Sequence, residues 1–345
     1  MDEQETSRPA IEAPTVSVIV PCRNEALRIG GLLAALAAQR YDLARVEIII
    51  ADGGSTDGTH RAIDVACAQY PMLDIQVLDN PNTSIPAALN LALAAARGTY
   101  IVRMDAHSAP HPEYLARCIS LLEAGRGANV GGVWQIAPGA ETLIARGIAA
   151  AAGSPLAVGD AKYRYTSQAG PVDTVPFGAF RRDLALRLAG YDETLLANED
   201  YEFNVRIRWN GGTIWLDPQI RATYYARPTL RALARQYWRY GFWKQHMLRR
   251  NPETLRPRQV AAPTLVATLS VLSLLAPFAR IARWLLALVL ALYAGLLALA
   301  AGGAARKERK PALLVVVPPA VATMHLAWGS GFLAGMLGGR AAGRR

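Results

Sequence analysis

The sequence predicts an α/β domain with a mostly parallel, doubly wound sheet and helices on both of its faces, followed by transmembrane helices. Short β-branched runs alternate with amphipathic stretches over residues 16–104, which is typical of a parallel sheet. Polar motifs follow several of these runs, at the edge where such sheets bind ligands. After Arg258 the chain changes character, because long runs without Asp, Glu, Lys or Arg begin there.

The alternating region supplies the first candidate binding groups. Strands are expected at residues 16–20, 46–51, 75–78 and 100–104, and helices at residues 25–40, 56–70 and 85–97. The first helix has Ile29, Leu32, Leu33 and Leu36 on one face, and Gly98 closes the third helix. Because parallel strands end at one edge of the sheet, the polar side chains that follow them should lie close together. These are Asn24 and Glu25 after the first strand, Asp52 after the second, and Asp105 and His107 after the fourth.

The second half of the domain is less regular. Residues 131–152 are rich in Gly and Ala, residues 172–180 suggest a strand and a loop, and a helix is expected at residues 181–189. A further helix at residues 198–209 has Glu199 and Asp200 in its first turn. Since the helix dipole favours negative charge there, a structural role is the alternative to a catalytic one.

Basic and aromatic side chains are interleaved in the next expected helix, residues 227–250. Arginines recur at four-residue spacing, at Arg227, Arg231, Arg235 and Arg239. The aromatic residues among them are Tyr237, Trp238, Tyr240, Phe242 and Trp243. Such a segment suits an interfacial helix that lies on a bilayer, and a solvated basic face over an aromatic core is the alternative.

Three apolar runs follow, at residues 260–279, 284–305 and 311–339, and they account for much of the 52% hydrophobic content. Each is long enough to cross a bilayer, which takes about 20 apolar residues in a helix, and buried core helices are the alternative. The expected organisation is therefore a flexible tail at 1–14, an α/β domain at 15–225, an interfacial helix at 226–258, and a membrane domain at 259–345 with two to three transmembrane segments.

The net charge of +10 is concentrated beside these runs. The clusters are Arg249, Arg250, Arg256 and Arg258, and then Arg306, Lys307, Arg309 and Lys310. The positive-inside tendency places both clusters and the large domain on the cytoplasmic side of the inner membrane. A third span would leave the last arginines outside, and Pro318–Pro319 allows a kinked or re-entrant last segment instead. The charge favours contact with anionic lipid rather than nucleic acid, because no nucleic-acid-binding motif accompanies it.

Several kinds of chemistry lack their usual signature in this chain. The sequence has no Walker A loop, no Gly-x-Gly-x-x-Gly, no His-Glu-x-x-His and no Gly-x-Ser-x-Gly. The cysteines Cys22, Cys67 and Cys118 have no Cys-x-x-Cys spacing and are expected to be reduced thiols. Residues 1–14 are polar and acidic, so a loose tail is expected there rather than a signal peptide.

Asp105-x-His107 is the most informative short motif. It places a carboxylate and an imidazole two residues apart at the end of a buried strand, from where both can reach one divalent metal ion. The alternative for His107 is that it supports a metal ligand without binding the metal itself.

Five segments, taken in order, resemble the family 2 glycosyltransferases, which have the GT-A fold. They are VSVIVPCRNE at 16–25, ADGGSTDGT at 51–59, ARGTYIVRMDAH at 96–107, AGYDETLLANEDYEFNVRI at 189–207 and RQYWRYG at 235–241. The resemblance covers about residues 15–250, and within the family the chain is most similar to the ExoA-type membrane glucosyltransferases of bacterial exopolysaccharide assembly.

The resemblance implies a UDP-sugar donor, a divalent metal (Mn or Mg) and inversion at the anomeric carbon. By this resemblance Asp52 would hydrogen-bond the uracil, and Asp57 would shape the glycine-rich turn. Further donor-binding positions would be Pro21, Arg23, Asn24, Glu25, Gly53, Arg103, Asp105 and Gln236. Asp105 falls on the first carboxylate of the family's Asp-x-Asp metal motif, while His107 replaces the second, which shifts the metal preference toward Mn.

The same resemblance gives catalytic roles to three residues. Asp200 falls on the catalytic base, and Glu199 would orient the acceptor or support Asp200. Gln236-x-x-Arg239-Tyr240 resembles the Gln-x-x-Arg-Trp motif of membrane-bound polysaccharide synthases, so Arg239 would stabilise the leaving group. Tyr replaces Trp in that motif, and Tyr224-Tyr225 stands where the family often has a His ligand.

The expected function is transfer of a sugar, glucose as the first expectation, from a UDP-sugar to a lipid-linked (polyprenyl diphosphate) oligosaccharide at the cytoplasmic face of the membrane. One alternative is a polyprenyl-phosphate sugar synthase, whose anionic acceptor needs no base. A processive polysaccharide synthase is another, although three spans are few for a channel. A non-catalytic sugar-nucleotide-binding scaffold is the third. Sugar specificity is expected to depend on the irregular region from Trp134 to Gly178.

Overall fold

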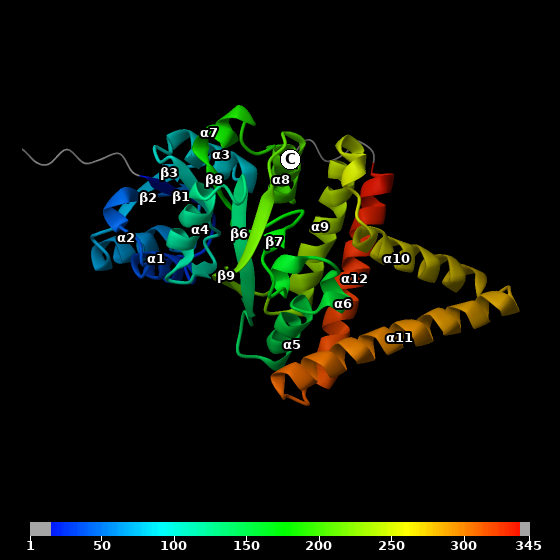
Figure 1. Ribbon diagram of the computed structural model, residues 1–345. Helices are drawn as coiled ribbons and strands as arrows, with labels where there is room; N and C mark the ends of the chain where they lie inside the picture. Colours follow the sequence, from blue (N-terminus) through cyan, green and yellow to red (C-terminus); the bar gives the residue numbers. More distant parts are fainter. Residues whose placement is uncertain (1–14, 339–345) are drawn as a thin grey trace, which may run out of the picture.

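The computed structural model describes residues 15–338, and a mixed nine-stranded sheet lies at the centre of this part of the chain (Figure 1). The strand order is β3-β2-β1-β4-β8-β6-β9-β5, with β7 paired to β9. The strands are β1 Val16–Cys22, β2 Val46–Asp52, β3 Asp74–Asp79, β4 Tyr100–Arg103, β5 Ser108–Pro110, β6 Asn129–Ala137, β7 Gly170–Pro171, β8 Ala179–Arg181 and β9 Ile214–Tyr225. The first four are parallel, and β8 runs antiparallel to both of its neighbours.

Helices cover both faces of the sheet, as predicted. Val16, Val18 and Val20 of β1 face one core, which contains buried residues of α1 Ile29–Ala37, α2 Thr59–Gln69 and α4 Tyr114–Glu123. Ile19 of β1 points to the opposite core, against α3 Ile85–Ala95 and α8 Glu199–Trp209. This alternation follows from the two-residue period of side chains along a strand. The remaining helices of the domain are α5 Leu143–Ala152, α6 Pro155–Val158 and α7 Arg182–Arg187.

The four predicted parallel strands are confirmed, with boundaries that differ by one or two residues. The first helix was predicted too early: α1 begins at Ile29, and residues 26–28 form a turn. The N–H of Glu25 donates to Thr59 Oγ1 and the N–H of Ala26 donates to Asp57, so the chain is tied to the turn before α2 ahead of its own helix.

The second half contains several elements that the sequence did not reveal, among them α4 and the twelve-residue strand β9. Of the strand and loop expected at residues 172–180, residues 172–178 are a loop that joins β7 to β8, and residues 179–180 begin β8. Strand β9 pairs with β6 along its length but shifts register between Leu216 and Arg221, opposite Gly131 and Val133. Pro218 lies in this irregular stretch, and a proline inside a strand is typical of a bulge.

Four long helices form the C-terminal part: α9 Leu230–Arg250, α10 Pro257–Leu275, α11 Arg280–Glu308 and α12 Leu313–Leu337. Figure 1 shows α10 and α11 as a hairpin that stands away from the sheet, with α12 returning beside α9. Within the described residues, α11 and α12 are long and apolar enough to cross a membrane, whereas the apolar run of α10 spans only Gln259–Leu275. The apolar helix predicted at residues 260–279 was therefore too long at its C-terminal end, because α10 ends at Leu275.

Helix α12 is continuous through Pro318 and Pro319, so the break expected there is absent. It packs so tightly along α9 that glycines are needed at the contact. A Cβ atom at Gly241 would lie 2.0 Å from the carbonyl oxygen of Trp328, and one at Gly331 would lie 2.1 Å from that of Trp238. The helix expected to lie on a bilayer is thus covered by α12 on one side.

Candidate active site

Three carboxylates meet around one guanidinium at the end of β4. Arg103, only 5% exposed, has Nη2 2.8 Å from Asp105 Oδ1 and 3.3 Å from Glu199 Oε1, and its Nη1 donates to Asp200. Asp105 follows the same strand by two residues, whereas the other two carboxylates come from the first turn of α8. Asn198 precedes them with a φ of 67°, a left-handed conformation that turns the chain into the helix. The structure therefore brings together four residues that the sequence placed at two separate motifs.

The cluster has more negative than positive charge, which affects protonation. Burial raises the pKa of Asp200 to about 7; Arg103 opposes the shift, while Glu199 and Asp105 add to it. Burial also raises the pKa of Glu199, against the influence of Arg103. A carboxylate with a pKa near neutrality can accept a proton from a hydroxyl group, which is the property required of a general base.

His107 lies between two carboxylates. Its Nδ1 is 3.0 Å from Glu25 Oε1, and its Nε2 is 3.9 Å from Asp105 Oδ2. Burial alone would lower the pKa of His107, but the hydrogen bond with Glu25 and the charge of Asp105 raise it. A carboxylate on one ring nitrogen fixes the tautomer and directs the other nitrogen toward a ligand.

The donor set of Asp105 and His107 fits one divalent ion. Their facing atoms are close enough to share an ion that binds each of them at about 2.1 Å. Among residues 15–338, no group of three or more His, Cys, Asp or Glu side chains is arranged to hold a metal. The protein would thus supply two ligands, and substrate phosphate oxygens and water would supply the others, as is common for Mg²⁺ at phosphate sites.

The loops after β1 and β2 are tied to each other. Asn24, with a φ of 55°, accepts a hydrogen bond from the Thr56 N–H at 2.8 Å, and its own N–H donates to Ser55 Oγ at 2.8 Å. Pro21 is buried within β1 opposite Ala51, Arg23 is exposed, and the Gly53 N–H donates to the Cys22 carbonyl at 2.8 Å. These contacts fix the edge at which both strands end.

Asp52 is almost fully buried at this edge and accepts hydrogen bonds from the N–H and hydroxyl of Ser55, while His60 Nε2 lies 3.0 Å away. Burial would raise the pKa of Asp52, but these hydrogen bonds lower it below its usual value. Asp57 accepts from the backbone and hydroxyl of Thr59, in agreement with the turn-shaping role expected for it.

Helix α9 contributes Gln236 and Arg239. Gln236 Nε2 donates to the hydroxyl groups of Tyr224 and Tyr240, each at 3.0 Å, and Arg239 Nη2 donates to the Leu196 carbonyl at 2.8 Å. Arg239 thereby contacts the loop just before α8, a short distance along the chain from Asp200.

One cavity of about 930 Å³ adjoins these groups. Its lining includes Arg103, Asp105, His107, Glu199, Asp200, Gln236 and Arg239. Asp52 and residues 21–25 are outside that lining, so the predicted donor-binding residues fall into two places. The cavity continues between α10, α11 and α12, where Leu265, Leu292 and Leu296 form an apolar wall. Trp134, Tyr163 and Arg164 also line it; they belong to the irregular region expected to contact the sugar, but the sequence did not single them out.

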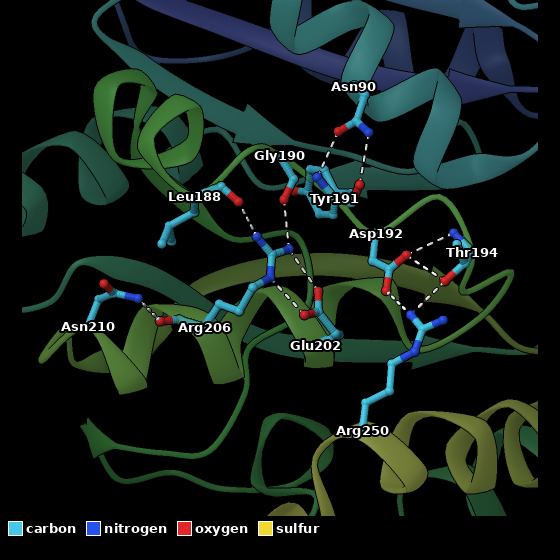
Figure 2. A network of polar contacts seen from close by, with 10 residues as sticks. All are labelled: Asn90, Leu188, Gly190, Tyr191, Asp192, Thr194, Glu202, Arg206, Asn210 and Arg250. Carbon is cyan, nitrogen blue, oxygen red and sulfur yellow. Dashed lines mark hydrogen bonds and ion pairs between the residues drawn. The ribbon is translucent and has the colours of Figure 1, made fainter.

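A polar network supports the segment that leads into α8 (Figure 2). Arg206 of α8 donates to the carbonyl oxygens of Leu188 and Gly190 and pairs with Glu202 at 2.7 Å. Asn90 of α3 bonds both backbone groups of Tyr191. From α9, Arg250 reaches Asp192 at 2.6 Å. Side chains from α3, α9 and α8 itself therefore fix the segment before α8 and, through it, the position of Asp200.

Comparison with known proteins agrees with this architecture. The Glycosyl transferase family 2 profile matches residues 17–188. The chain is 30% identical over 318 residues to the succinoglycan biosynthesis protein ExoA of Rhizobium meliloti (strain 1021), covering 91% of this chain and 93% of that protein. It is 26% identical to a dolichyl N-acetyl-α-D-glucosaminyl phosphate 3-β-D-2,3-diacetamido-2,3-dideoxy-β-D-glucuronosyltransferase of Methanococcus voltae, covering 68% of this chain and 74% of that protein.

Two solved structures show the same fold. The mannosyltransferase PcManGT from Pyrobaculum calidifontis, in complex with GDP-Man and Mn²⁺, is 22% identical with a TM-score of 0.61, covering 94% of this chain and 87% of that one. S. aureus TarS 1-349 in complex with UDP-GlcNAc is 17% identical with a TM-score of 0.51, covering 94% and 92%. The fold and site thus define a GT-A glycosyltransferase. The chain belongs to glycosyl transferase family 2 and is similar to exopolysaccharide and lipid-linked glycosyltransferases.

Proposed function

We propose that this protein is an inverting, metal-dependent glycosyltransferase that moves a sugar from a UDP-sugar to a lipid-linked oligosaccharide, with glucose as the first donor to test. One observation carries the proposal: the facing atoms of Asp105 and His107 and the carboxylate of Asp200 line the same cavity. Two side chains that can bind a metal ion and a carboxylate with a pKa of about 7 are the two elements that such a transfer requires.

In the proposed reaction, Asp200 accepts the proton of an acceptor hydroxyl whose oxygen attacks the anomeric carbon of the sugar. The bond to the nucleoside diphosphate breaks from the opposite face, so that an α-linked donor gives a β-linked product. Arg103 holds Asp200 in place and favours its ionised, proton-accepting form before the acceptor arrives. A bound divalent ion, held by Asp105 and His107, would neutralise charge on the departing diphosphate.

The donor would extend from Asp105 toward the edge where β1 and β2 end. Asp52 is proposed to accept a hydrogen bond from the uracil, with Pro21, Arg23, Asn24, Glu25 and Gly53 around the uridine. Two similar structures contain nucleotide sugars, GDP-Man in one and UDP-GlcNAc in the other, which supports the donor class. Glu199 would orient the acceptor, and Gln236 and Arg239 would contact the diphosphate.

The acceptor and the location are proposed from the apolar part of the cavity and from the relatives. Two similar proteins are named for succinoglycan biosynthesis and for transfer to a dolichyl-linked sugar phosphate. Helices α11 and α12 are candidate spans, and α11 leaves most of its apolar surface uncovered. We therefore propose that the protein is held at the cytoplasmic face of the inner membrane by its C-terminal helices.

The test measures UDP release by the detergent-purified protein from several UDP-sugars, with Mn or Mg and a lipid-linked acceptor extract. Asp105→Ala and Asp200→Asn should each lower the rate by about 100-fold or more, the range for loss of a general base or metal ligand. Asp183→Asn is the matched control, because Asp183 is an exposed carboxylate of α7 paired only with nearby arginines. The product is then examined by NMR for its anomeric configuration.

Release that persists in Asp200→Asn would favour a polyprenyl-phosphate synthase, whose acceptor is already an anion. No release from any donor, together with measurable UDP binding, would favour the non-catalytic scaffold and overturn the proposal.

A further inference from the structure

Arg164 is a cation without an acidic partner inside the cavity. It ends the short 3-10 helix Lys162–Arg164, and its guanidinium lies over the rings of Trp134 and Tyr163, at 4.8 and 5.3 Å from their centroids. Among the described residues, no carboxylate lies within ion-pairing distance of it. Apart from its neighbour Tyr163, its hydrogen-bond contact is a long one of 3.5 Å to the Ala152 carbonyl.

Such an arrangement leaves donors and charge unused. A guanidinium has five N–H donors in a planar fork that suits phosphate oxygens. The groups beneath Arg164 are the faces of the Trp134 and Tyr163 rings, which attract a cation through the ring quadrupole. An enclosed charge without a counter-ion is costly, whereas an anionic ligand in the cavity would supply both the charge and the acceptors.

The place of Arg164 in the cavity indicates which anion. Trp134, beneath the guanidinium, stacks on Tyr224, whose ring is 6.1 Å from that of His107, two residues from Asp105. The contact of Arg164 with the Ala152 carbonyl, at the end of α5, connects it to the part of the cavity lined by Leu156 and Ala157 of α6, a helix that contacts α11 and α12. A molecule that fills the cavity therefore meets carboxylates, then a cation on an aromatic platform, and then hydrocarbon. A lipid with a phosphate between its sugar and its isoprenoid chain has this order of chemistry.

We propose that Arg164 binds the phosphate of a polyprenyl-linked acceptor, with the isoprenoid chain along α10, α11 and α12. Trp134 and Tyr163 act as the platform that holds the guanidinium flat against the phosphate. This proposal rests on the proposed function for the acceptor class, but it does not depend on which sugar is transferred. It makes Arg164 a binding residue for the acceptor and leaves the donor diphosphate at Asp105 and His107.

The test measures binding of farnesyl diphosphate to the detergent-purified full-length protein by isothermal titration calorimetry. Wild type is compared with Arg164→Met, Arg164→Lys and the matched control Arg146→Met, since Arg146 is an arginine of α5 paired with Glu141 and outside the cavity lining. Arg164→Met should weaken binding by about tenfold or more, the loss of charge-assisted hydrogen bonds, and Arg164→Lys by less. Arg146→Met should bind as wild type does.

Three further probes, farnesol, UDP and phosphatidylglycerol, show which ligand group Arg164 recognises. Farnesol should bind weakly and equally to all variants, because it lacks the phosphate. The affinity for UDP in the presence of Mn should stay within about twofold of wild type in Arg164→Met, which also shows that the variant is folded. If the Met variant does not bind UDP, Arg164→Lys decides, and its expected result is weakened farnesyl diphosphate binding with normal UDP binding.

Unchanged affinity of Arg164→Met for farnesyl diphosphate would overturn the proposal. So would a loss of UDP affinity in Arg164→Lys, which would assign Arg164 to the donor, or displacement of farnesyl diphosphate by phosphatidylglycerol micelles, which would assign it to ordinary phospholipid. If wild type releases no UDP from any donor while farnesyl diphosphate binding still requires Arg164, the proposed transfer reaction is wrong. The proposed phosphate site at Arg164 is then still supported.

Discussion

The contact between α9 and α12 gives a sharp quantitative prediction. A Cβ atom at position 241 would lie 2.0 Å from the Trp328 carbonyl oxygen, where ordinary contact begins at 3.4 Å. In Gly241→Ala the helices would have to separate by about 1.4 Å (3.4 minus 2.0 Å), and a gap of 0.5–1 Å already forfeits a quarter to a half of the dispersion energy. Overpacking of this kind costs about 1–3 kcal/mol.

The matched control is Gly31→Ala. Gly31 lies in the helix α1, has no neighbour within 4 Å of an added Cβ, and has an ordinary φ. Alanine there should stabilise the protein by about 0.5–1 kcal/mol, because glycine loses more backbone entropy on folding. At about 2–4 °C per kcal/mol, we expect Tm to fall by about 2–12 °C in Gly241→Ala and to rise by about 1–4 °C in Gly31→Ala.

The assay is thermal unfolding in detergent, followed by tryptophan fluorescence. Gly331→Ala should behave as Gly241→Ala does, since its Cβ would lie 2.1 Å from the Trp238 carbonyl oxygen across the same interface. The double variant should lose less than the sum, because one separation relieves both clashes. A Gly241→Ala protein as stable as wild type would refute the close contact between these helices.

Two further predictions concern the half of the domain that contains β1 and β2. Burial would raise the pKa of Glu47, but hydrogen bonds from Ser17 and Arg97 lower it below 4.5. The ionised Glu47 therefore stabilises the fold above pH 4.5. This stabilisation is lost as the pH falls through the lowered pKa. Glu47→Gln should therefore cost about 1–3 kcal/mol at pH 7, with the Tm gap to wild type narrowing on acidification; a gap that is constant with pH would contradict this assignment. At Asn24, whose φ is 55°, Gly should be tolerated better than Ala by about 1 kcal/mol in chemical denaturation, and equal losses would argue against strain at this position.

The sequence was sufficient for the parallel half of the sheet because each strand there is a short β-branched run between helical patterns. Strand β9 escaped prediction because Pro218 and the polar residues around it interrupt the pattern in the middle of the strand. Its pairing with β6 depends on contacts between distant parts of the chain, which local propensity does not encode.

The candidate site was predictable as a set of residues but not as an arrangement. Motif order identified Asp105, Glu199 and Asp200, yet nothing local indicated that Arg103 would contact all three. Arg164 gave no signal, because a lone arginine in an irregular segment is usually a solvated side chain. Its significance comes from Trp134, thirty residues earlier in the chain, and from the absence of a carboxylate within ion-pairing distance among the described residues.

The apolar runs were recognised, but their partners were not. A run such as residues 311–339 has the same composition whether it faces lipid or protein. The four-residue spacing of the small residues Gly331 and Gly335 was the feature of the sequence that indicated a close helical neighbour for α12.

The return of α12 to the domain has a consequence for biosynthesis. The carboxylates and the strand edge belong to the first 200 residues or so of the sequence, whereas Met324, His325 and Trp328 of the cavity wall leave the ribosome well after them. A nascent chain can therefore fold its sheet early and still lack one side of the cavity. The apolar wall of the cavity closes only when α12 docks on α9, after the α10–α11 hairpin has been made, so completion of the cavity is coupled to assembly of these helices.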